Sequence, residues 1–222
     1  MRTAAFIPIK SNSERVKGKN FRLFLGKPLY QHIIQHALEA KCFEKIYVDT
    51  DSKEIQEYCA SLSVSTIQRE PALVRNDANG NDLLSHHYDL YPDYDCYAQL
   101  FATAPLLKPE TINSCIRKMH LRYHNADDTS GFDSILTGTT ESGWFWYNGQ
   151  PVNFRPGILP RSQDATGPFK ESTGLYAILG SSLRKYRCRT GAKPILSEIS
   201  QLEAIDLDTE QDFRLAEIIL EQ

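Results

Sequence analysis

Two aspartates near the end of the chain have the spacing of a metal-binding pair. Asp206 and Asp208 are two residues apart in the stretch "AIDLD". In an extended segment both carboxylates would share one face, while Ile205 and Leu207 would turn to the core. Such carboxylates repel each other unless a cation lies between them, and Mg²⁺ is commonly held by one or two carboxylates and substrate phosphates. The spacing fits equally well a solvated pair at the start of the following helix.

A basic loop near the N-terminus is the second candidate site. The stretch "KSNSERVKGKN" directly follows an apolar run and contains four cations: Lys10, Arg15, Lys17 and Lys19. Their mutual repulsion costs stability unless an anion shares the loop. Cationic, hydroxyl and flexible backbone groups are those with which proteins bind a triphosphate. The pattern G-x-x-x-x-G-K-[ST] is absent, which excludes a standard P-loop. A solvated loop is the alternative, but a cationic loop plus a carboxylate pair favours a site for nucleotide and magnesium.

Other candidate residues favour structural roles. His32/His36 and His120/His124 have helical i, i+4 spacing, but neither pair occurs in an H-E-x-x-H motif, so we expect surface or packing roles. The dense tyrosines between positions 58 and 97 are expected at the edge of the core. The five cysteines form no C-x-x-C pair, which favours a reducing cytoplasm over a disulfide framework or zinc ribbon.

The elements that must position these residues alternate along the chain. Apolar runs predict strands at 3–9, 45–50, 64–68, 95–103, 133–138, 172–179 and 204–208. Amphipathic patterns and caps predict helices at 27–40, 51–62, 81–90, 109–123, 181–187 and 209–222. This alternation predicts a doubly wound α/β sheet with right-handed crossovers. Ligands in such sheets bind beyond the carboxyl ends of the strands, where the basic loop lies.

One segment interrupts this alternation. The sequence "GWFWYNGQPVNF" alternates around Asn148-Gly149, a strong hairpin signal, and residues 155–170 are expected to form a long loop. We predict a single domain over residues 1–222, with a small lobe inserted at about 140–170. Trp144 and Trp146 in this lobe suit either a dimer contact or a ligand contact.

Composition narrows the class of protein. The chain has 222 residues, 41% hydrophobic and 24% charged, as expected of one soluble globular domain. A net charge of −3 argues against a general nucleic-acid binder. No apolar stretch approaches the length of a membrane span, and the N-terminus is too soon interrupted for a signal peptide. We therefore expect a cytoplasmic protein without membrane or nucleic-acid partners.

Four stretches resemble one family in order along nearly the whole chain. They are "FIPIKSNSERVKGKNFRLFLGKPLYQHIIQHAL", "YVDTDSKEI", "ATAPLLKPETI" and "AIDLDTEQDFRLAE". They are similar to the acylneuraminate cytidylyltransferases, the CMP-sialic acid synthetases, with the deoxy-octulosonate cytidylyltransferases more distant. The resemblance implies a three-layer α/β/α Rossmann-like nucleotidyltransferase fold with a mixed, mainly parallel sheet. It also implies Mg²⁺ (or Mn²⁺) dependence and a homodimer whose small lobe covers the partner's active site.

The resemblance implies a reaction and its residues. The anomeric hydroxyl of a 2-keto-3-deoxy sugar acid would attack the α-phosphate of CTP, giving a CMP-sugar and pyrophosphate. Nucleotide binding would fall to Lys10, Ser11, Ser13, Arg15, Lys19, Asn20, Arg69, Gly80 and Asn81, with Lys19, Arg15 and Asp208 catalytic. Sugar binding would fall to Phe101, Thr103, Arg161, Gln163 and Thr173, and metal binding to Asp206 and Asp208.

The departures from the family collect on the sugar side. Phe101 replaces a Gln that commonly faces the sugar, and Thr173 stands for an Asn before "LYAI". Lys10 replaces Arg, which keeps the charge but loses the bidentate fork. We therefore expect the CTP step to be retained, with an acceptor other than ordinary N-acetylneuraminate, such as a pseudaminate or legionaminate. The alternatives are a nucleotidyltransferase for another nucleotide or for another sugar such as deoxy-octulosonate, and a CTP-binding protein without catalysis.

Overall fold

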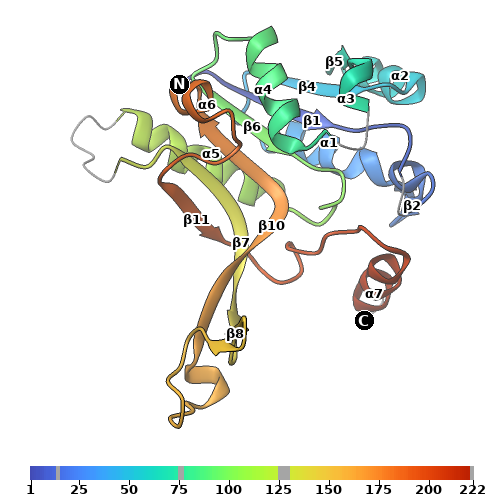
Figure 1. Cartoon of the computed structure of the whole chain (residues 1–222). Coiled ribbons are helices and arrows are strands. Elements are labelled where there is room, and N and C mark those ends of the chain that lie inside the picture. Colours follow the sequence, from blue (N-terminus) through green and yellow to red (C-terminus); the bar gives the residue numbers. More distant parts are fainter. Residues whose placement is uncertain (14–15, 75–77, 125–130, 221–222) are drawn as a thin grey trace.

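A seven-stranded sheet forms the centre of the computed structural model, which describes residues 1–13, 16–74, 78–124 and 131–220. The strand order is β11-β7-β10-β6-β1-β4-β5, and two short hairpins, β2-β3 and β8-β9, lie outside this sheet (Figure 1). The strands are β1 (Thr3–Pro8), β2 (Leu23–Phe24), β3 (Lys27–Pro28), β4 (Lys45–Thr50), β5 (Ser65–Gln68), β6 (Cys96–Leu100), β7 (Ser134–Ser142), β8 (Trp146–Tyr147), β9 (Gln150–Pro151), β10 (Thr166–Leu179) and β11 (Pro194–Glu198).

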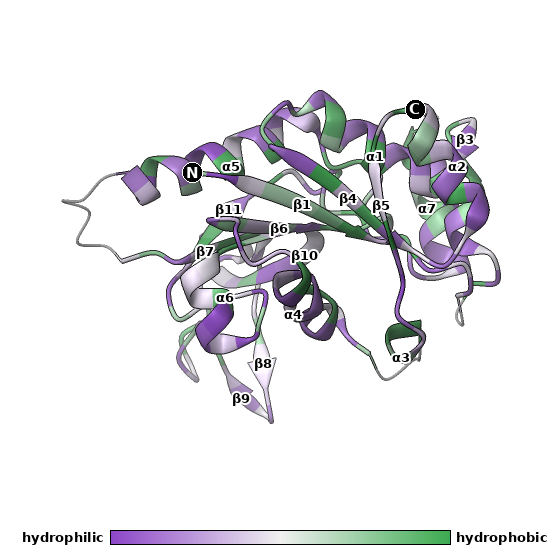
Figure 2. Ribbon diagram, turned by 90° about the horizontal axis from the view of Figure 1, so that it is seen from above, coloured by the Kyte–Doolittle hydropathy of each residue, from purple (hydrophilic) through white to green (hydrophobic). Residues whose placement is uncertain are grey.

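Helices cover both faces of this sheet. They are α1 (Leu29–Glu39), α2 (Lys53–Ser61), α3 (Pro71–Val74), α4 (Gly80–Leu90), α5 (Pro109–His124), α6 (Gly180–Tyr186) and α7 (Glu210–Leu220), with 3₁₀ turns η1 (Lys19–Phe21) and η2 (Ser162–Asp164). One core joins Ala5 and Ile7 of β1 to α1, α2 and α5, and the opposite core joins Phe6 to α4 and α6. The predicted three-layer α/β/α architecture is confirmed, and Figure 2 shows helices on both sides of the sheet, with hydrophilic and hydrophobic residues mixed along them.

Strand directions confirm a mixed, mainly parallel sheet. The pairs β1–β4, β1–β6, β4–β5 and β7–β11 are parallel, whereas β10 is antiparallel to both β6 and β7. Residues of β1 are buried on both faces, which explains its nearly continuous apolar sequence. The carboxyl ends of the parallel strands therefore meet at one edge, where ligand sites of α/β sheets form.

An arm leaves the sheet at this same edge. The distal parts of β7 and β10 run beyond the sheet and carry the β8-β9 hairpin (Figure 1). Asn148 and Gly149 both have positive φ, 48° and 74°, as the predicted two-residue hairpin turn requires. Trp146, Tyr147 and Ile158 on the arm are 63%, 73% and 68% exposed. The arm is therefore an exposed apolar surface of the single chain.

Two predicted elements differ from the structure, and one strand was not predicted. Residues 204–208 are not a strand: this segment has no strand neighbour, and Leu207 donates one backbone hydrogen bond to Thr103 O at 2.8 Å. The segment 155–170 is not wholly a loop, since its last residues begin β10. Strand β11 was missed, because it begins at Pro194 and pairs only with β7 at the edge of the sheet.

The residues assigned structural roles behave as predicted. Tyr97 is buried, and Tyr88, Tyr91 and Tyr94 pack against its cluster at the core edge. His32 is buried with its Nε2 2.8 Å from Phe24 O, which is a packing role. Among the residues described, no group of three or more His, Cys, Asp or Glu side chains could hold a metal ion. In the same part of the chain, no helix is long and apolar enough to span a bilayer.

Candidate active site

A polar pocket of about 310 Å³ lies beyond the carboxyl ends of β1, β5 and β6. Its walls come from the basic loop, the segment around Arg69, the start of α4 and the segment after β6. Lining residues include Lys10, Ser13, Lys19, Asn20, Arg69, Asn79, Gly80, Phe101 and Thr103. All of these except Asn79 belong to the predicted nucleotide-binding and sugar-binding sets. The structure thus brings together side chains that are far apart in the sequence.

The basic loop is held in shape by three local contacts. The Asn20 side chain donates from Nδ2 to Lys10 O at 2.9 Å, which joins the two ends of the loop. Gly18 has φ 66°, a left-handed conformation that glycine adopts without strain, and leads into η1. Ser11 donates from its backbone N and its Oγ to Asp51 at 2.6 and 2.7 Å. The predicted residue Ser11 therefore supports the loop and does not line the pocket, and Arg15 lies outside the described residues.

The two aspartates lie beside this pocket and have different partners. Asp208 Oδ1 is 2.7 Å from Lys19 Nζ, and this ion pair is mostly buried, with side-chain exposures of 28% and 11%. Asp206 Oδ1 is buried and has no hydrogen-bond partner. Burial raises the pKa of the Asp206 carboxyl, and the nearby Asp208 carboxylate raises it further, although the Thr103 hydroxyl acts in the opposite sense. The Asp206 carboxylate, which has an oxygen without a hydrogen-bond partner and is repelled by Asp208, is therefore suited to bind a cation.

Leu207 explains how a non-strand segment still presents both aspartates. This side chain is fully buried with Phe24 and Leu29 on one side and Phe213 of α7 on the other. The α7 helix begins with the predicted Thr209–Asp212 capping box, in which Asp212 N donates to Thr209 Oγ1 at 3.3 Å and Thr209 N donates to Asp212 Oδ2 at 2.6 Å. The segment is therefore anchored by a core residue and a helix cap.

A second pocket of about 400 Å³ lies on the other side of Asp206, at the base of the arm. It is lined by Thr173 and Glu171 of β10, Glu141 of β7, and the apolar face of α7 that includes Leu215 and Ile219. Of the predicted sugar-binding residues, Thr173 lines this pocket, while Phe101 and Thr103 line the first one. Asp206 lines this second pocket, and its neighbour Asp208 pairs with Lys19 of the first pocket, so the aspartate pair is connected to both.

Two predicted sugar-binding residues lie elsewhere. Arg161 and Gln163 are exposed on the arm and line neither pocket. Arg161 forms an exposed ion pair with Asp164 at 2.5 Å. Asn81 also lies outside the first pocket, where its Oδ1 accepts a hydrogen bond from Arg189 N at 3.1 Å. These three residues are therefore not brought to the pockets within one chain.

Sequence reasoning missed three residues near the first pocket. Asp49 and His87 are almost fully buried. Asp49 pairs with Arg69, whose side chain is 3% exposed, and His87 contacts the other oxygen of the same carboxylate. The aspartate inside the apolar strand "KIYVDT" could have indicated a buried polar group, because a buried carboxylate needs hydrogen-bonding or charged partners. Arg189 lies over the Tyr176 ring at 4.0 Å and follows α6 in a stretch without a recognisable motif.

Close backbone approach explains a glycine at the start of α4. A Cβ on Gly80 would lie 2.9 Å from Arg189 Nη1 and 3.2 Å from Gln99 Oε1. Gln99 also donates from Nε2 to Gly80 O at 2.9 Å. A larger residue at this position would have to displace the ends of the Arg189 and Gln99 side chains, so a glycine fits this close approach.

The strand order and the flanking helical layers define a Rossmann-like α/β/α fold with a mixed, mainly parallel sheet. In the solved structures, the chain resembles a CMP:2-keto-3-deoxy-manno-octonic acid synthetase complexed with CTP, with TM-score 0.67 and 17% identity over 100% of this chain and 99% of that one. The model of the family described as "Cytidylyltransferase" matches residues 4–141, and the chain belongs to this family.

Curated relatives confirm the resemblance to the acylneuraminate cytidylyltransferases. The N-acylneuraminate cytidylyltransferase A of Danio rerio is 22% identical over 96% of this chain and 50% of its own length. The CMP-N,N'-diacetyllegionaminic acid synthase of Legionella pneumophila is 36% identical over 52% of each protein. The chain spans about half the length of these curated relatives.

Proposed function

We propose that this chain transfers CMP from CTP to a 2-keto-3-deoxy sugar acid, sialic acid or a related bacterial nonulosonate, and releases pyrophosphate. The observation that carries the proposal is the convergence of Lys10, Lys19 and Arg69 on one pocket beside a pair of aspartates. Cationic hydrogen-bond donors at the carboxyl edge of a parallel sheet are suited to bind a nucleoside triphosphate. The family and its named relatives support cytidine as the base.

We further propose that Asp206 and Asp208 hold Mg²⁺ or Mn²⁺. The residues fit this role, because Asp206 Oδ1 is buried without a hydrogen-bond partner and carboxylate oxygens are the preferred ligands of these ions. When bound, the metal would neutralise charge on the phosphate oxygens. Lys19 lies 2.7 Å from Asp208 Oδ1 and balances the charge of that carboxylate in this structure.

The reaction is an in-line displacement at phosphorus. The anomeric oxygen forms a bond to the α-phosphorus, the bond from that phosphorus to the bridging oxygen breaks, and pyrophosphate leaves. In the proposed mechanism, Lys10 and Lys19 stabilise the charge on the phosphates, and one of the two aspartates orients the attacking hydroxyl. Such chemistry depends on positioning and electrostatic stabilisation more than on covalent participation by the protein.

The pocket at the base of the arm is the proposed acceptor site. Thr173 and Phe101 stand where the resembling family has other side chains, so we propose an acceptor other than N-acetylneuraminate. Arg161 and Gln163 would reach the sugar acid only from the arm of a second copy, and the exposed Trp146 and Tyr147 suit such a contact. We therefore propose a homodimer, working in the cytoplasm, in which each arm completes the partner's acceptor site.

Pyrophosphate release from CTP and Mg²⁺ tests this proposal. The panel of acceptors would include sialic, pseudaminic, legionaminic and deoxy-octulosonic acids, with UTP in place of CTP as the control. Release with one nonulosonic acid and CTP is the expected result. Release only with deoxy-octulosonate, or only with UTP, would show a different nucleotidyltransferase. CTP binding without release with any acceptor in the panel would contradict the transfer reaction and favour a binding protein.

A further inference from the structure

Asp49 and His87 form a buried group with Arg69 and fix the position of its side chain at the wall of the first pocket. Arg69 Nε donates to Asp49 Oδ1 at 2.9 Å, and Arg69 Nη2 donates to the backbone carbonyl oxygen of Asp49 at 3.0 Å. The side chains of Arg69 and Asp49 are 3% and 1% exposed. Two bonds from one edge of the planar guanidinium fix both its position and the orientation of its plane.

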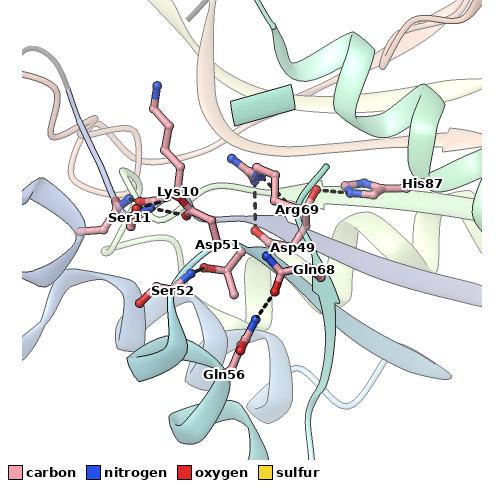
Figure 3. A network of polar contacts seen from close by, with 11 residues as sticks. Lys10, Ser11, Asp49, Asp51, Ser52, Gln56, Gln68, Arg69 and His87 are labelled. Atoms are coloured by element: carbon pink, nitrogen blue, oxygen red, sulfur yellow. Dashed lines mark hydrogen bonds and ion pairs between the residues drawn. The ribbon is translucent and has the colours of Figure 1, made fainter. Parts of the chain in front are cut away.

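His87 fixes the carboxylate in turn. Its Nε2 lies 2.7 Å from Asp49 Oδ2, and the imidazole is completely buried and stacked on Phe6 with ring centroids 4.7 Å apart. In Figure 3 the Arg69 guanidinium and the His87 ring approach Asp49 from opposite sides. Because each carboxylate oxygen has its own donor, the Asp49 side chain cannot rotate without losing a buried hydrogen bond.

The charges in this group balance. Burial lowers the pKa of His87, so the imidazole is neutral near pH 7 and donates from Nε2. Although burial alone would raise the pKa of Asp49, the hydrogen bonds from His87 and Arg69 and the charge of Arg69 hold it below its usual value. One carboxylate therefore compensates one guanidinium. A guanidinium whose charge is compensated attracts a triphosphate less than an unpaired cation does, and it still donates hydrogen bonds.

The unused donors of Arg69 are suited to a pyrimidine edge. A guanidinium has five N–H groups, and Asp49 takes two of them, so three remain for a ligand in the pocket that Arg69 lines, as far as the described residues show. Cytosine presents two adjacent acceptors, O2 and N3, whereas uracil carries an N–H at position 3. Paired donors therefore satisfy cytosine and oppose the N–H of uracil.

We infer that Asp49 and His87 are positioning residues that aim the Arg69 guanidinium at the base of the nucleotide and so set the preference for cytosine over uracil. This inference rests on the proposed function, because it takes the pocket to be the CTP site. Neither residue touches the nucleotide in this arrangement; both act through Arg69. Their removal should change nucleotide choice more than the rate of transfer.

The test compares CTP and UTP on four variants of the full chain. Asp49→Asn removes the charge that holds Arg69, and His87→Leu removes the donor to Asp49. His87→Gln retains a side-chain N–H donor and is the conservative rescue. Gln56→Ala is the matched control, because Gln56 bonds Gln68 at 2.8 Å next to Arg69 in the chain, and neither glutamine touches the buried group. Titration calorimetry gives the Kd of each nucleotide, and pyrophosphate release gives kcat and KM.

Asp49→Asn and His87→Leu should each raise the Kd for CTP at least tenfold, so that the Kd values for CTP and UTP become similar. In both variants kcat at saturating CTP should stay within about threefold, since the groups at the phosphates are unchanged. His87→Gln should recover most of the preference, and Gln56→Ala should keep all of it.

An unchanged preference in a folded Asp49→Asn protein would overturn the inference. Equal weakening of both nucleotides with a matching fall in kcat would also overturn it, since that result indicates general damage to the pocket. If His87→Leu does not fold, the nucleotide preference of Asp49→Asn and of His87→Gln still tests the inference. Failure of the unaltered protein to bind CTP would refute the proposed function itself, a result distinct from loss of preference in the variants.

Discussion

Replacing the two aspartates by asparagine should abolish the same activity while changing stability in opposite directions. Asp208 is the partner of Lys19 in a pair whose side chains are 28% and 11% exposed. In Asp208→Asn the new amide oxygen would still accept a hydrogen bond from Lys19, but a bond to a neutral acceptor is weaker than one to a carboxylate by about 1–1.5 kcal/mol. We therefore expect Asp208→Asn to lower stability by that amount.

Asp206→Asn has the opposite expected effect on stability. Burial and the neighbouring Asp208 carboxylate both raise the pKa of Asp206, which means that the fold disfavours its charge. A neutral side chain of the same shape removes this penalty, so metal-free stability should be equal to or above that of the unaltered protein. Pyrophosphate release should fall at least a hundredfold in both variants, because each would lose a proposed metal ligand.

Thermal unfolding in the presence of a chelator measures these changes. For a chain of this size, 1 kcal/mol corresponds to about 2–4 °C in Tm, so Asp208→Asn should lower Tm by about 2–6 °C. Circular dichroism of each folded variant controls for misfolding. A lower Tm for Asp206→Asn than for Asp208→Asn would refute the assignment of different partners. Full activity of Asp208→Asn with Mg²⁺ present would refute the metal role.

Three further results are expected. Gly138→Ala should lower Tm by about 2–12 °C, because its Cβ would clash with the backbone carbonyl oxygen of Lys170 and overpacking costs about 1–3 kcal/mol; an unchanged Tm would contradict this. Leu207→Ala should destabilise the fold by about 2–5 kcal/mol and lower pyrophosphate release, measured by urea unfolding and turnover; full stability would show that the segment is not core-anchored. Stability should fall as pH decreases below about 6.5, because burial lowers the pKa of His32 and His87 and the unfolded chain then binds protons that the fold excludes. Tm measured between pH 7.5 and 5 checks this, and a rise on acidification would contradict it.

The sheet could be predicted because its strands carry local signals. Strand β1 is apolar on both faces, and the loop after it gathers cationic residues at the edge of the sheet where ligands bind. The place of Lys10 and Lys19 at the ligand edge followed from the rule that carboxyl ends of parallel strands meet. Arg69 and Gly80, which line the same pocket, were assigned only through the resemblance to the cytidylyltransferases.

Other parts depend on contacts that no local pattern encodes. The alternation in "AIDLD" predicted a strand, but a strand needs a neighbour with free backbone groups, and here Leu207 is instead held by α7 and one bond to Thr103. The partnership of Asp49 with His87 joins residues 38 positions apart in the chain. The place of Arg161 depends on how far the arm extends, which composition does not determine.

The single reversed strand of the sheet has a consequence for assembly. Because β10 runs against its neighbours, it begins at the edge where β6 and β7 end, and the arm therefore starts at that edge. If β10 were parallel to them, its first residues would lie at the opposite end of the sheet, far from Asp206. Reversal of one strand thus brings the exposed apolar surface of the arm and the two pockets to the same side of the molecule, so that anything bound to the arm would also lie close to the pockets.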